Sequence, residues 1–266
     1  MTDRQKFAKL HNAKRVWAVA SVHGEAERLE RLHDKLAPRL RPGDRIVYLG
    51  NMIGRGSAVR ETLDALLRFR VAVMAGQHGF ACDLAYLRGS QEEMWQKLLQ
   101  IQFATDPPGT LAWMLDNGLA PTLEAYGSSA GEARRQASGG AIGLTRWTAG
   151  LRGAMQARPG HYAFFGILRR AAFTDDGSLL FVNSGLDPSR PLEAQKDSFW
   201  WSSAGFARIV EPYGTYRLIV RGFDPEAPGL KTTACTVTVD GGCGFGGPLM
   251  AACVTSAGQV VETLEA

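Results

Sequence analysis

Two histidines and one arginine in the first third of the sequence stand in short segments that contain glycine: His23, Arg55 and His78. An imidazole can exchange a proton near neutral pH, and a guanidinium binds carboxylate or phosphate oxygens through paired hydrogen bonds. Hydroxyl and amide side chains, such as those of Ser21 and Gln77, share these segments. Whether these groups lie together depends on the elements that position them.

The residues around these segments alternate between strand and helix patterns. Apolar runs predict strands at Val16–Ala20, Arg45–Leu49 and Val71–Ala75, and leucines at helical spacing predict helices at Ala26–Leu36 and Val59–Phe69. A βαβαβ order implies parallel strands whose carboxyl ends meet at one edge of the sheet, where ligands bind. We therefore expect the chemistry in the segments that follow the strands: Ser21–Gly24, Gly50–Gly56 and Gly76–Gly79.

The rest of the sequence changes pattern twice. Residues 80 to about 158 are mostly helical in pattern, and strands are predicted at Leu179–Val182, Tyr216–Val220, Cys235–Val239, Met250–Val254 and Gln259–Thr263. Gly241–Gly247 lacks the Lys-Ser/Thr of a nucleoside-triphosphate loop, so we predict a turn there. We expect a basic tail at residues 1–15 and a single domain at 16–266 with a helical insertion at about 80–158.

The composition narrows the class of protein. Lys and Arg exceed Asp and Glu by 30 to 26, and this mild excess fits an anionic ligand but lacks the basic stripe typical of nucleic-acid-binding proteins. No apolar run is long enough for a membrane span, and the charged N-terminal residues do not form a secretory signal. The four cysteines show no metal-like spacing and fit a cytoplasmic protein.

Six segments resemble motifs of the calcineurin-like metallophosphoesterases, in order and rough spacing: Val19–Gly24, Asp44–Gly56, Val73–Gly79, Leu180–Gly185, Val220–Asp224 and Val239–Thr255. The family motifs read GDxHG, GDxxDRG, GNHE, VHAG and GHT. The sequence is most similar to the phosphoprotein phosphatase branch, which includes bacterial serine/threonine phosphatases and diadenosine tetraphosphatases. The resemblance covers nearly the whole chain. It implies an α/β fold, a β-sandwich of two mixed sheets flanked by helices, with the helical stretch as an insertion.

The chemistry of this family explains its motifs. Two divalent cations, held by carboxylates and imidazoles, activate a water molecule and bind the phosphoryl oxygens. A separate histidine protonates the leaving group, and an arginine binds the phosphate. By this resemblance, His78 is the remnant of the general acid and Arg55 is the remnant of the phosphate-binding arginine.

At the positions of the metal ligands this sequence departs from the family. The residues there are Ser21, His23, Asn51, Gln77, Asn183 and Phe223, of which His23 alone is of the expected type. The aspartate that supports the general acid is replaced by Gly54, and the glutamate of GNHE by Gly79. Because the two lost carboxylates carried the negative charge that a pair of divalent cations requires, the resemblance implies a pseudophosphatase that needs no cofactor.

Other carboxylates could replace the lost ligands. Asp224 or Asp187 could reach the site by a shift along the chain, and His23 with Asp224 could hold one Mn²⁺ weakly, whereas Asp44 is expected to point away. This alternative predicts a divergent metal-dependent phosphoesterase with weak activity, of the serine/threonine phosphatase or dinucleoside tetraphosphatase type.

Loss of the carboxylates also leaves a more positive pocket. Arg55, His23, His78 and Arg221 could bind phosphate without a metal. We therefore expect a binding or regulatory protein whose partner is a phosphorylated protein or a nucleotide-like anion. In the opposing interpretation, the histidines are ordinary polar loop residues and Arg55 pairs with a surface carboxylate.

An aromatic triplet, Phe199-Trp200-Trp201, allows a third hypothesis. Three adjacent rings can belong to the core, or they can be exposed and serve as an interaction surface. The sequence leaves both readings open.

Overall fold

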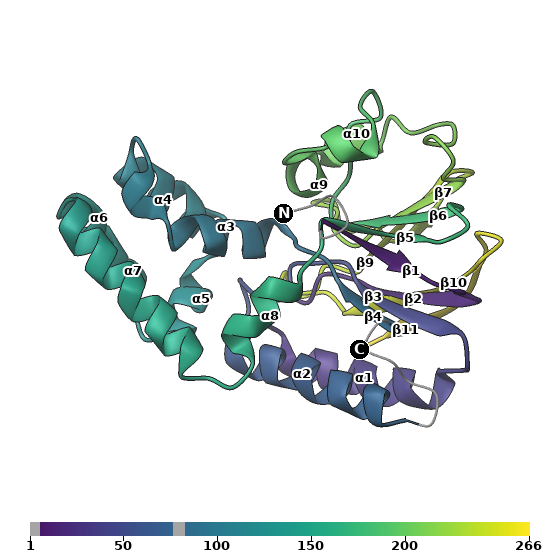
Figure 1. Cartoon of the computed structure of the whole chain (residues 1–266), viewed down its shortest axis with the longest axis horizontal. Helices are drawn as coiled ribbons and strands as arrows, with labels where there is room; N and C mark the ends of the chain where they lie inside the picture. Colours follow the sequence, from purple (N-terminus) through teal and green to yellow (C-terminus); the bar gives the residue numbers. More distant parts are fainter. Residues whose placement is uncertain (1–5, 77–82) are drawn as a thin grey trace.

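The computed structural model describes residues 6–76 and 83–266 and shows four layers (Figure 1). In this part of the chain one sheet has the strand order β11-β10-β2-β3-β4, and the other has the order β1-β5-β6-β7-β9-β8. Helices α1 and α2 cover the outer face of the first sheet, and α9 and α10 lie over the second (Figure 1). Both sheets contain parallel and antiparallel pairs. The expected sandwich of two mixed sheets flanked by helices is confirmed.

The strands are β1 (Phe7–Leu10), β2 (Arg15–Val19), β3 (Asp44–Tyr48), β4 (Leu84–Tyr86), β5 (Ala171–Thr174), β6 (Leu179–Val182), β7 (Leu218–Arg221), β8 (Gly229–Thr232), β9 (Thr236–Asp240), β10 (Met250–Thr255) and β11 (Val260–Glu265). The α-helices are α1 (Ala26–Leu36), α2 (Val59–Ala75), α3 (Ser90–Leu98), α4 (Pro107–Asp116), α5 (Ala120–Ala125), α6 (Ala130–Ser138), α7 (Ala141–Gln156), α8 (His161–Ile167), α9 (Ser198–Trp201) and α10 (Ser203–Phe206). Short 3₁₀ turns occupy Ala37–Arg39, Ile101–Phe103 and Leu192–Ala194.

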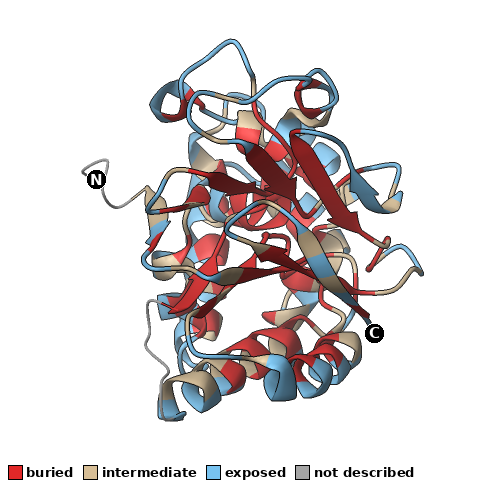
Figure 2. Ribbon diagram, turned by 90° about the vertical axis from the view of Figure 1, so that its right-hand side faces the viewer, coloured by how far each residue is buried: buried red, intermediate tan, exposed pale blue. Residues whose placement is uncertain are grey.

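The core lies between the sheets and beneath the helices, where the central strands are buried along their length (Figure 2). Leu29, Leu32 and Leu36 of α1 are fully buried because their spacing puts them on one face of the helix. A smaller apolar cluster, which includes Phe199 and Phe206, joins α9 and α10 to the outer face of the second sheet. No helix in the described ranges combines the length and the hydropathy that a membrane crossing needs.

Helices α3 to α7 follow β4 and form an arm that projects from the sandwich, at the left of Figure 1. This arm corresponds to most of the stretch whose pattern predicted helices. Hydrogen bonds of the buried His161 ring anchor its base: Tyr126, which follows α5, bonds His161 Nδ1 at 2.9 Å, and His161 Nε2 bonds Asp64 of α2 at 3.0 Å. The loops at the base of the arm therefore have a fixed position relative to the sheets.

Two predicted elements are wrong. Val71–Ala75 is not a strand, because α2 continues without a break to Ala75, and the next parallel strand is β4 at Leu84–Tyr86. Residues 1–15 are not a tail throughout, because Phe7–Leu10 forms β1 and pairs in parallel with β5. Leu10 is 1% exposed and belongs to the main core, so burial of this side chain holds the segment against the sheet.

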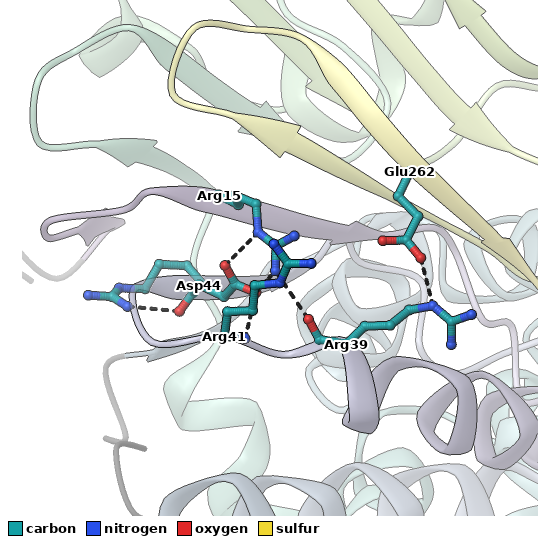
Figure 3. A network of polar contacts seen from close by, with 6 residues as sticks. Arg15, Arg39, Arg41, Asp44 and Glu262 are labelled. Carbon is teal, nitrogen blue, oxygen red and sulfur yellow. Dashed lines mark hydrogen bonds and ion pairs between the residues drawn. The ribbon is translucent and has the colours of Figure 1, made fainter.

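The amino ends of β2 and β3 are held by an arginine–carboxylate network (Figure 3). Arg15 donates from Nε to Asp44 Oδ1 at 2.9 Å, and the backbone N–H of Arg41 donates to Asp44 Oδ2 at 2.9 Å. Arg39 donates to Glu262 at 2.6 Å and so ties this end of the sheet to β11. Asp44 therefore accepts its hydrogen bonds at the amino end of β3 and points away from the carboxyl end of this strand, as expected.

Candidate functional site

The carboxyl ends of β2, β3, β6 and β7 converge with the start of α3 on a cavity of about 300 Å³. Polar side chains on its wall come from His23, Arg55, Ser90, Gln91, Asn117, Ser184 and Ser203, and apolar side chains come from Met94, Trp200, Trp201, Phe223, Pro225 and Phe245. His23 and Arg55, which the sequence placed in neighbouring segments, lie in one site.

Asn51 is the centre of a buried hydrogen-bond network behind this cavity. Its side-chain Nδ2 donates to Ser21 Oγ at 3.2 Å, and its Oδ1 accepts from Ser90 Oγ and from the Gln91 backbone N–H, both at 3.1 Å. Ser21 and Asn51 are both fully buried. Groups at the expected metal-ligand positions are therefore hydrogen-bonded to one another and to the loop before α3.

The side chain of Glu92 binds the backbone of the loop that contains Asn51. Its carboxylate accepts hydrogen bonds from the N–H groups of Asn51 at 2.9 Å, Met52 at 2.7 Å, Ile53 at 3.1 Å and Gly89 at 2.8 Å. Burial raises the pKa of Glu92, and these N–H groups oppose that shift because they stabilise the charged form. The sequence analysis did not single out Glu92.

This geometry changes the register of the third motif. The loop that follows the parallel strand β4 and contacts Asn51 is Gly89-Ser90-Gln91-Glu92, which keeps the glycine and glutamate of GNHE. The assignment of Gly76–Gly79 to the carboxyl end of a strand is wrong because α2 ends there. Ser90 and Gln91 then stand where the family has its asparagine and histidine.

The segment predicted to carry the general acid begins elsewhere. Gly76 follows the end of α2 and lines a different pocket, which it shares with Asp44 at the amino end of β3. Gln77 and His78 themselves lie outside the described residues. The acid role of His78 therefore stays a prediction, and it no longer has the support of the GNHE motif, whose histidine position is Gln91 in this register.

Gln91 also fills space beside Gly54. A Cβ atom on Gly54 would lie 2.2 Å from Gln91 Oε1, and the backbone of Gly54 has a left-handed φ of +88°. Gln91 Nε2 donates to the Asn117 carbonyl at 2.8 Å, which holds the side chain in this place. An aspartate at position 54 is therefore incompatible with Gln91 in this conformation.

His23 is neutral in this environment. Its ring is enclosed by Phe223 and Phe245, at centroid distances of 5.7 and 5.5 Å, and both ring nitrogens are buried and find no hydrogen-bond partner among the described residues. Burial is the main cause that lowers the pKa of His23 to about 3, and the charge of Arg55 adds to it. His23 therefore contributes no positive charge near pH 7.

Arg55 carries its charge at the wall of the cavity. Its guanidinium carbon lies 4.2 Å from the Phe245 ring centroid, and its Nε is buried and unpartnered within the described residues. No carboxylate in the described part of the chain forms an ion pair with it, contrary to the opposing interpretation. Burial lowers the pKa of Arg55, but an arginine stays protonated at neutral pH.

Arg221 lies one layer behind the cavity and is paired. Its Nη2 bonds Asp224, its Nε donates to Thr238 Oγ1 at 2.9 Å, and its Nη1 donates to Ser203 Oγ at 3.0 Å. Asp240 accepts the Asp224 backbone N–H at 2.8 Å, and burial raises the pKa of Asp240 to about 6. Because Asp224 already neutralises Arg221, this arginine is not available as a free cation.

The remaining ligand positions offer little to a metal. Asn183 donates from Nδ2 to the Leu49 carbonyl at 2.7 Å, and Phe223 presents a ring to His23. Asp187 accepts from Ser189 and pairs with Arg190. The described residues contain no group of three or more His, Cys, Asp or Glu placed to hold a metal ion. The donors that are present, neutral and mutually hydrogen-bonded, do not fit a pair of divalent cations.

The aromatic triplet divides between core and surface. Phe199 and Trp200 are buried, and Trp200 Nε1 donates to the Arg88 carbonyl at 2.7 Å. Trp201 is 43% exposed at the edge of the cavity and contacts Trp113 of α4, which is 46% exposed, edge to face at 5.3 Å. Phe199 and Trp200 therefore belong to the core and Trp201 is exposed, whereas its use as an interaction surface stays a prediction.

Comparison with solved structures identifies the architecture. A candidate diadenosine tetraphosphatase matches with a TM-score of 0.56 and 17% sequence identity, over 98% of each chain. A protein serine/threonine phosphatase from Saccharomyces cerevisiae matches with a TM-score of 0.53 and 14% identity, over 98% of this chain and 84% of that one. A cold-active protein tyrosine phosphatase matches with a TM-score of 0.52 and 15% identity, over 99% of this chain and 83% of that one.

The chain has the metallophosphoesterase fold. No protein-family model and no curated protein sequence matches it. At these identities the likeness shows the fold alone, so the function must be argued from the residues of the site. In the metallophosphoesterase fold of this chain, the loops that would hold metals are held by hydrogen bonds of Ser21, Asn51, Ser90 and Asn183 and by the Glu92 carboxylate, which binds backbone N–H groups.

Proposed function

We propose that this chain is a catalytically inactive protein of the metallophosphoesterase fold, a pseudophosphatase, that binds an anion in the cavity beside Arg55. The observation that carries the proposal is the network around Asn51, whose side chain is satisfied by Ser21, Ser90 and the Gln91 backbone. A metal would have to break these bonds and would gain no carboxylate in return. The free energy of binding would therefore be far less favourable than at a carboxylate-rich site.

Anion binding is supported by the unpaired charge of Arg55. The Arg55 side chain is partly buried, its Nε is fully buried without a partner, and no described carboxylate neutralises it, so a cation at the wall of a cavity is available to an anionic ligand. His23, His78 and Arg221 were expected to share this role. The neutral ring of His23 can donate one hydrogen bond, whereas Arg221 is already paired with Asp224.

The biological role follows as part of the same proposal. A protein that binds an anionic ligand or partner without hydrolysing it can regulate that partner or serve as a scaffold. A phosphorylated protein or a nucleotide-like anion is the partner that the family resemblance favours. The described cysteines, Cys235, Cys243 and Cys253, are buried and unpaired, which supports the cytoplasm as its compartment.

The test is metal content together with activity. Protein incubated with Mn²⁺ and dialysed should hold no more metal by elemental mass spectrometry than an unrelated control protein, and should not hydrolyse p-nitrophenyl phosphate with Mn²⁺ present. Retention of one or two ions per chain, with hydrolysis that is lost on addition of a chelator, would overturn the proposal. The chain would then be the divergent phosphoesterase that the sequence left open.

A further inference from the structure

The charge on the cavity wall is that of a single cation. Among the described residues that line the cavity there is no Asp, Glu or Lys, and Arg55 is the one arginine. The ring of His23 is enclosed by Phe223 and Phe245, and neither of its nitrogens bonds a described carboxylate that would hold a charge on the ring. The cavity therefore offers one unit of positive charge to a ligand.

Arg55 is held in place without the help of an acid. Its backbone has a left-handed φ of +46°, its N–H donates to the Gly118 carbonyl at 3.0 Å, and its side chain runs so close to Gly118 that a Cβ there would lie 2.7 Å from Arg55 Cγ. Such a backbone conformation is unfavourable for arginine and persists only where the surroundings impose it. The guanidinium is thus presented to the cavity in a fixed orientation.

The rest of the wall is rich in aromatic rings. Phe223 and Phe245 lie on one side, and Trp200 and Trp201 contribute their indoles. Trp200 is fixed by its bond to the Arg88 carbonyl, and the exposed rings of Phe245 and Trp201 stand where the cavity meets solvent. Rings that are exposed beside a cavity offer flat apolar surface to a planar ligand.

Size and charge together restrict the ligand. A volume of about 300 Å³ is at the lower end of small-molecule pockets, enough for one or two rings. A phosphate monoester carries a charge of about −1.5 to −2 at pH 7, so one arginine would leave much of that charge buried without a partner. A carboxylate carries one charge, and its two oxygens match the guanidinium fork.

We propose that the cavity binds an aryl carboxylate, with its carboxylate on the Arg55 guanidinium and its ring system against Phe245 and Trp201. This inference rests on the proposed anion-binding function and names the ligand class for it. It differs from a phosphate-binding role in the charge of the ligand and in the need for a planar body.

Isothermal titration calorimetry of the full chain at pH 8 tests this with 2-naphthoate as the probe. Three further compounds separate the requirements: inorganic phosphate has the charge without rings, 2-naphthyl phosphate has rings with a second charge, and cyclohexanecarboxylate has one charge without an aromatic ring. We expect 2-naphthoate to bind about tenfold or more tightly than each of the others. Stronger binding of 2-naphthyl phosphate, or of phosphate itself, would overturn the aryl carboxylate proposal.

Variants locate the binding. Arg55→Gln should weaken 2-naphthoate binding by about tenfold to a hundredfold and Arg55→Lys by less, whereas Arg146→Gln, on an exposed turn of α7, should leave it unchanged. Trp201→Ala should weaken binding and Trp201→Phe should restore most of it. Arg55→Gln removes an unpaired charge, so the melting temperature of this variant should be equal to or above that of the wild type. Such a result would exclude misfolding as the cause of the weaker 2-naphthoate binding.

The two proposals fail separately. If phosphate or 2-naphthyl phosphate binds more tightly than 2-naphthoate and this binding depends on Arg55, the aryl carboxylate assignment is wrong while the anion-binding proposal stands. If no compound in the series binds, or if Arg55→Gln binds as well as the wild type, the anion site at Arg55 is wrong although the chain can still lack metal and activity. If metal is retained and phosphate esters are hydrolysed, the proposed function itself is wrong.

Discussion

The network around Asn51 predicts what happens when carboxylates are placed at two positions where the motifs of the resembled family have aspartates. In the double variant Ser21→Asp/Asn51→Asp, two negative charges would replace groups that are now 3.2 Å apart and hydrogen-bonded. Two like charges about 4 Å apart repel by about 4 kcal/mol at the effective dielectric constant of a partly buried site. Loss of the hydrogen bond adds about 1 kcal/mol. Without metal, the free energy of unfolding should fall by about 5 kcal/mol.

Mn²⁺ should reverse this loss in the double variant and leave the wild type unchanged. A ligand that binds only the folded state stabilises it by about 2.7 kcal/mol at a hundred times its Kd and by about 4.1 kcal/mol at a thousand times. The assay is urea unfolding at pH 7 with Mn²⁺ or with a chelator. Adding Ser90→Asn, Asn183→His and Phe223→His to the pair should strengthen the Mn²⁺ effect, because these positions complete the ligand set of the family.

A size-matched variant separates charge from crowding. Ser21→Asn has the bulk of aspartate without its charge, so it measures the steric cost in the absence of a second carboxylate. The excess destabilisation of the double variant should also disappear at low pH, where the paired carboxyls are protonated. Equal stability of the double variant and Ser21→Asn, or no response to Mn²⁺, would refute the placement of the site at Asn51.

Two further predictions concern buried groups of the same site. The pKa of His23 is lowered from 6.5 to about 3, so its neutral form contributes stability that is complete above pH 6.5 and is lost as the pH falls toward 3. His23→Phe should remove about 3 kcal/mol of this pH dependence between pH 4 and 7, measured by urea unfolding; an unchanged slope would show that the ring is not enclosed. Glu92→Gln should lower the free energy of unfolding by about 2–3 kcal/mol, because an amide NH₂ would face backbone N–H groups that now donate to a carboxylate. In contrast, Glu27→Gln, at an exposed carboxylate paired with Arg31 on α1, should cost less than about 1 kcal/mol, and similar losses at both positions would contradict the role given to Glu92.

Most of the sandwich could be predicted from the sequence, because its strands and the two covering helices have clear periodicity. The leucines of α1 and the apolar residues of β2 and β3 are buried as their spacing predicts. The same reasoning fails at Val71–Ala75, where a β-branched apolar run that resembles a strand is the last part of α2. Tertiary context decides such short runs, and propensity alone does not.

The shortest strands carried too little signal. β4 consists of Leu84–Tyr86, and β1 contains an exposed lysine, so neither has the length or the alternation that identifies a strand. The missed β4 also explains the misplaced third motif, because Gly76-Gln77-His78 contains a histidine and Gly89-Ser90-Gln91 does not. Glu92, preceded by a glycine at the spacing of GNHE, was the available signal for the correct register.

The backbone conformation of the site could be predicted from its motifs, whereas the ion-pair partners of its side chains could not. His23, Asn51 and Arg55 all have left-handed backbones, at φ values of +54°, +55° and +46°, as their glycine-rich surroundings suggest. Pairing is different: Arg55 and Arg221 are the same residue type, yet Asp224 neutralises Arg221 and no carboxylate of the described chain neutralises Arg55. Whether an arginine forms an ion pair depends on the distance between side chains from separate loops, and this distance cannot be read from the spacing of residues in the sequence.

The contact between Gly54 and Gln91 has a consequence for the mutational history open to this chain. An aspartate introduced at Gly54 alone meets the Gln91 side chain and a backbone conformation that suits glycine, and it displaces Gln91 from the Asn117 carbonyl. A histidine introduced at Gln91 alone gives up the bond to Asn117 and finds no carboxylate at position 54. Each of the two substitutions is therefore disfavoured until the other has occurred. The two positions are coupled, so that the aspartate and the histidine can be introduced only together.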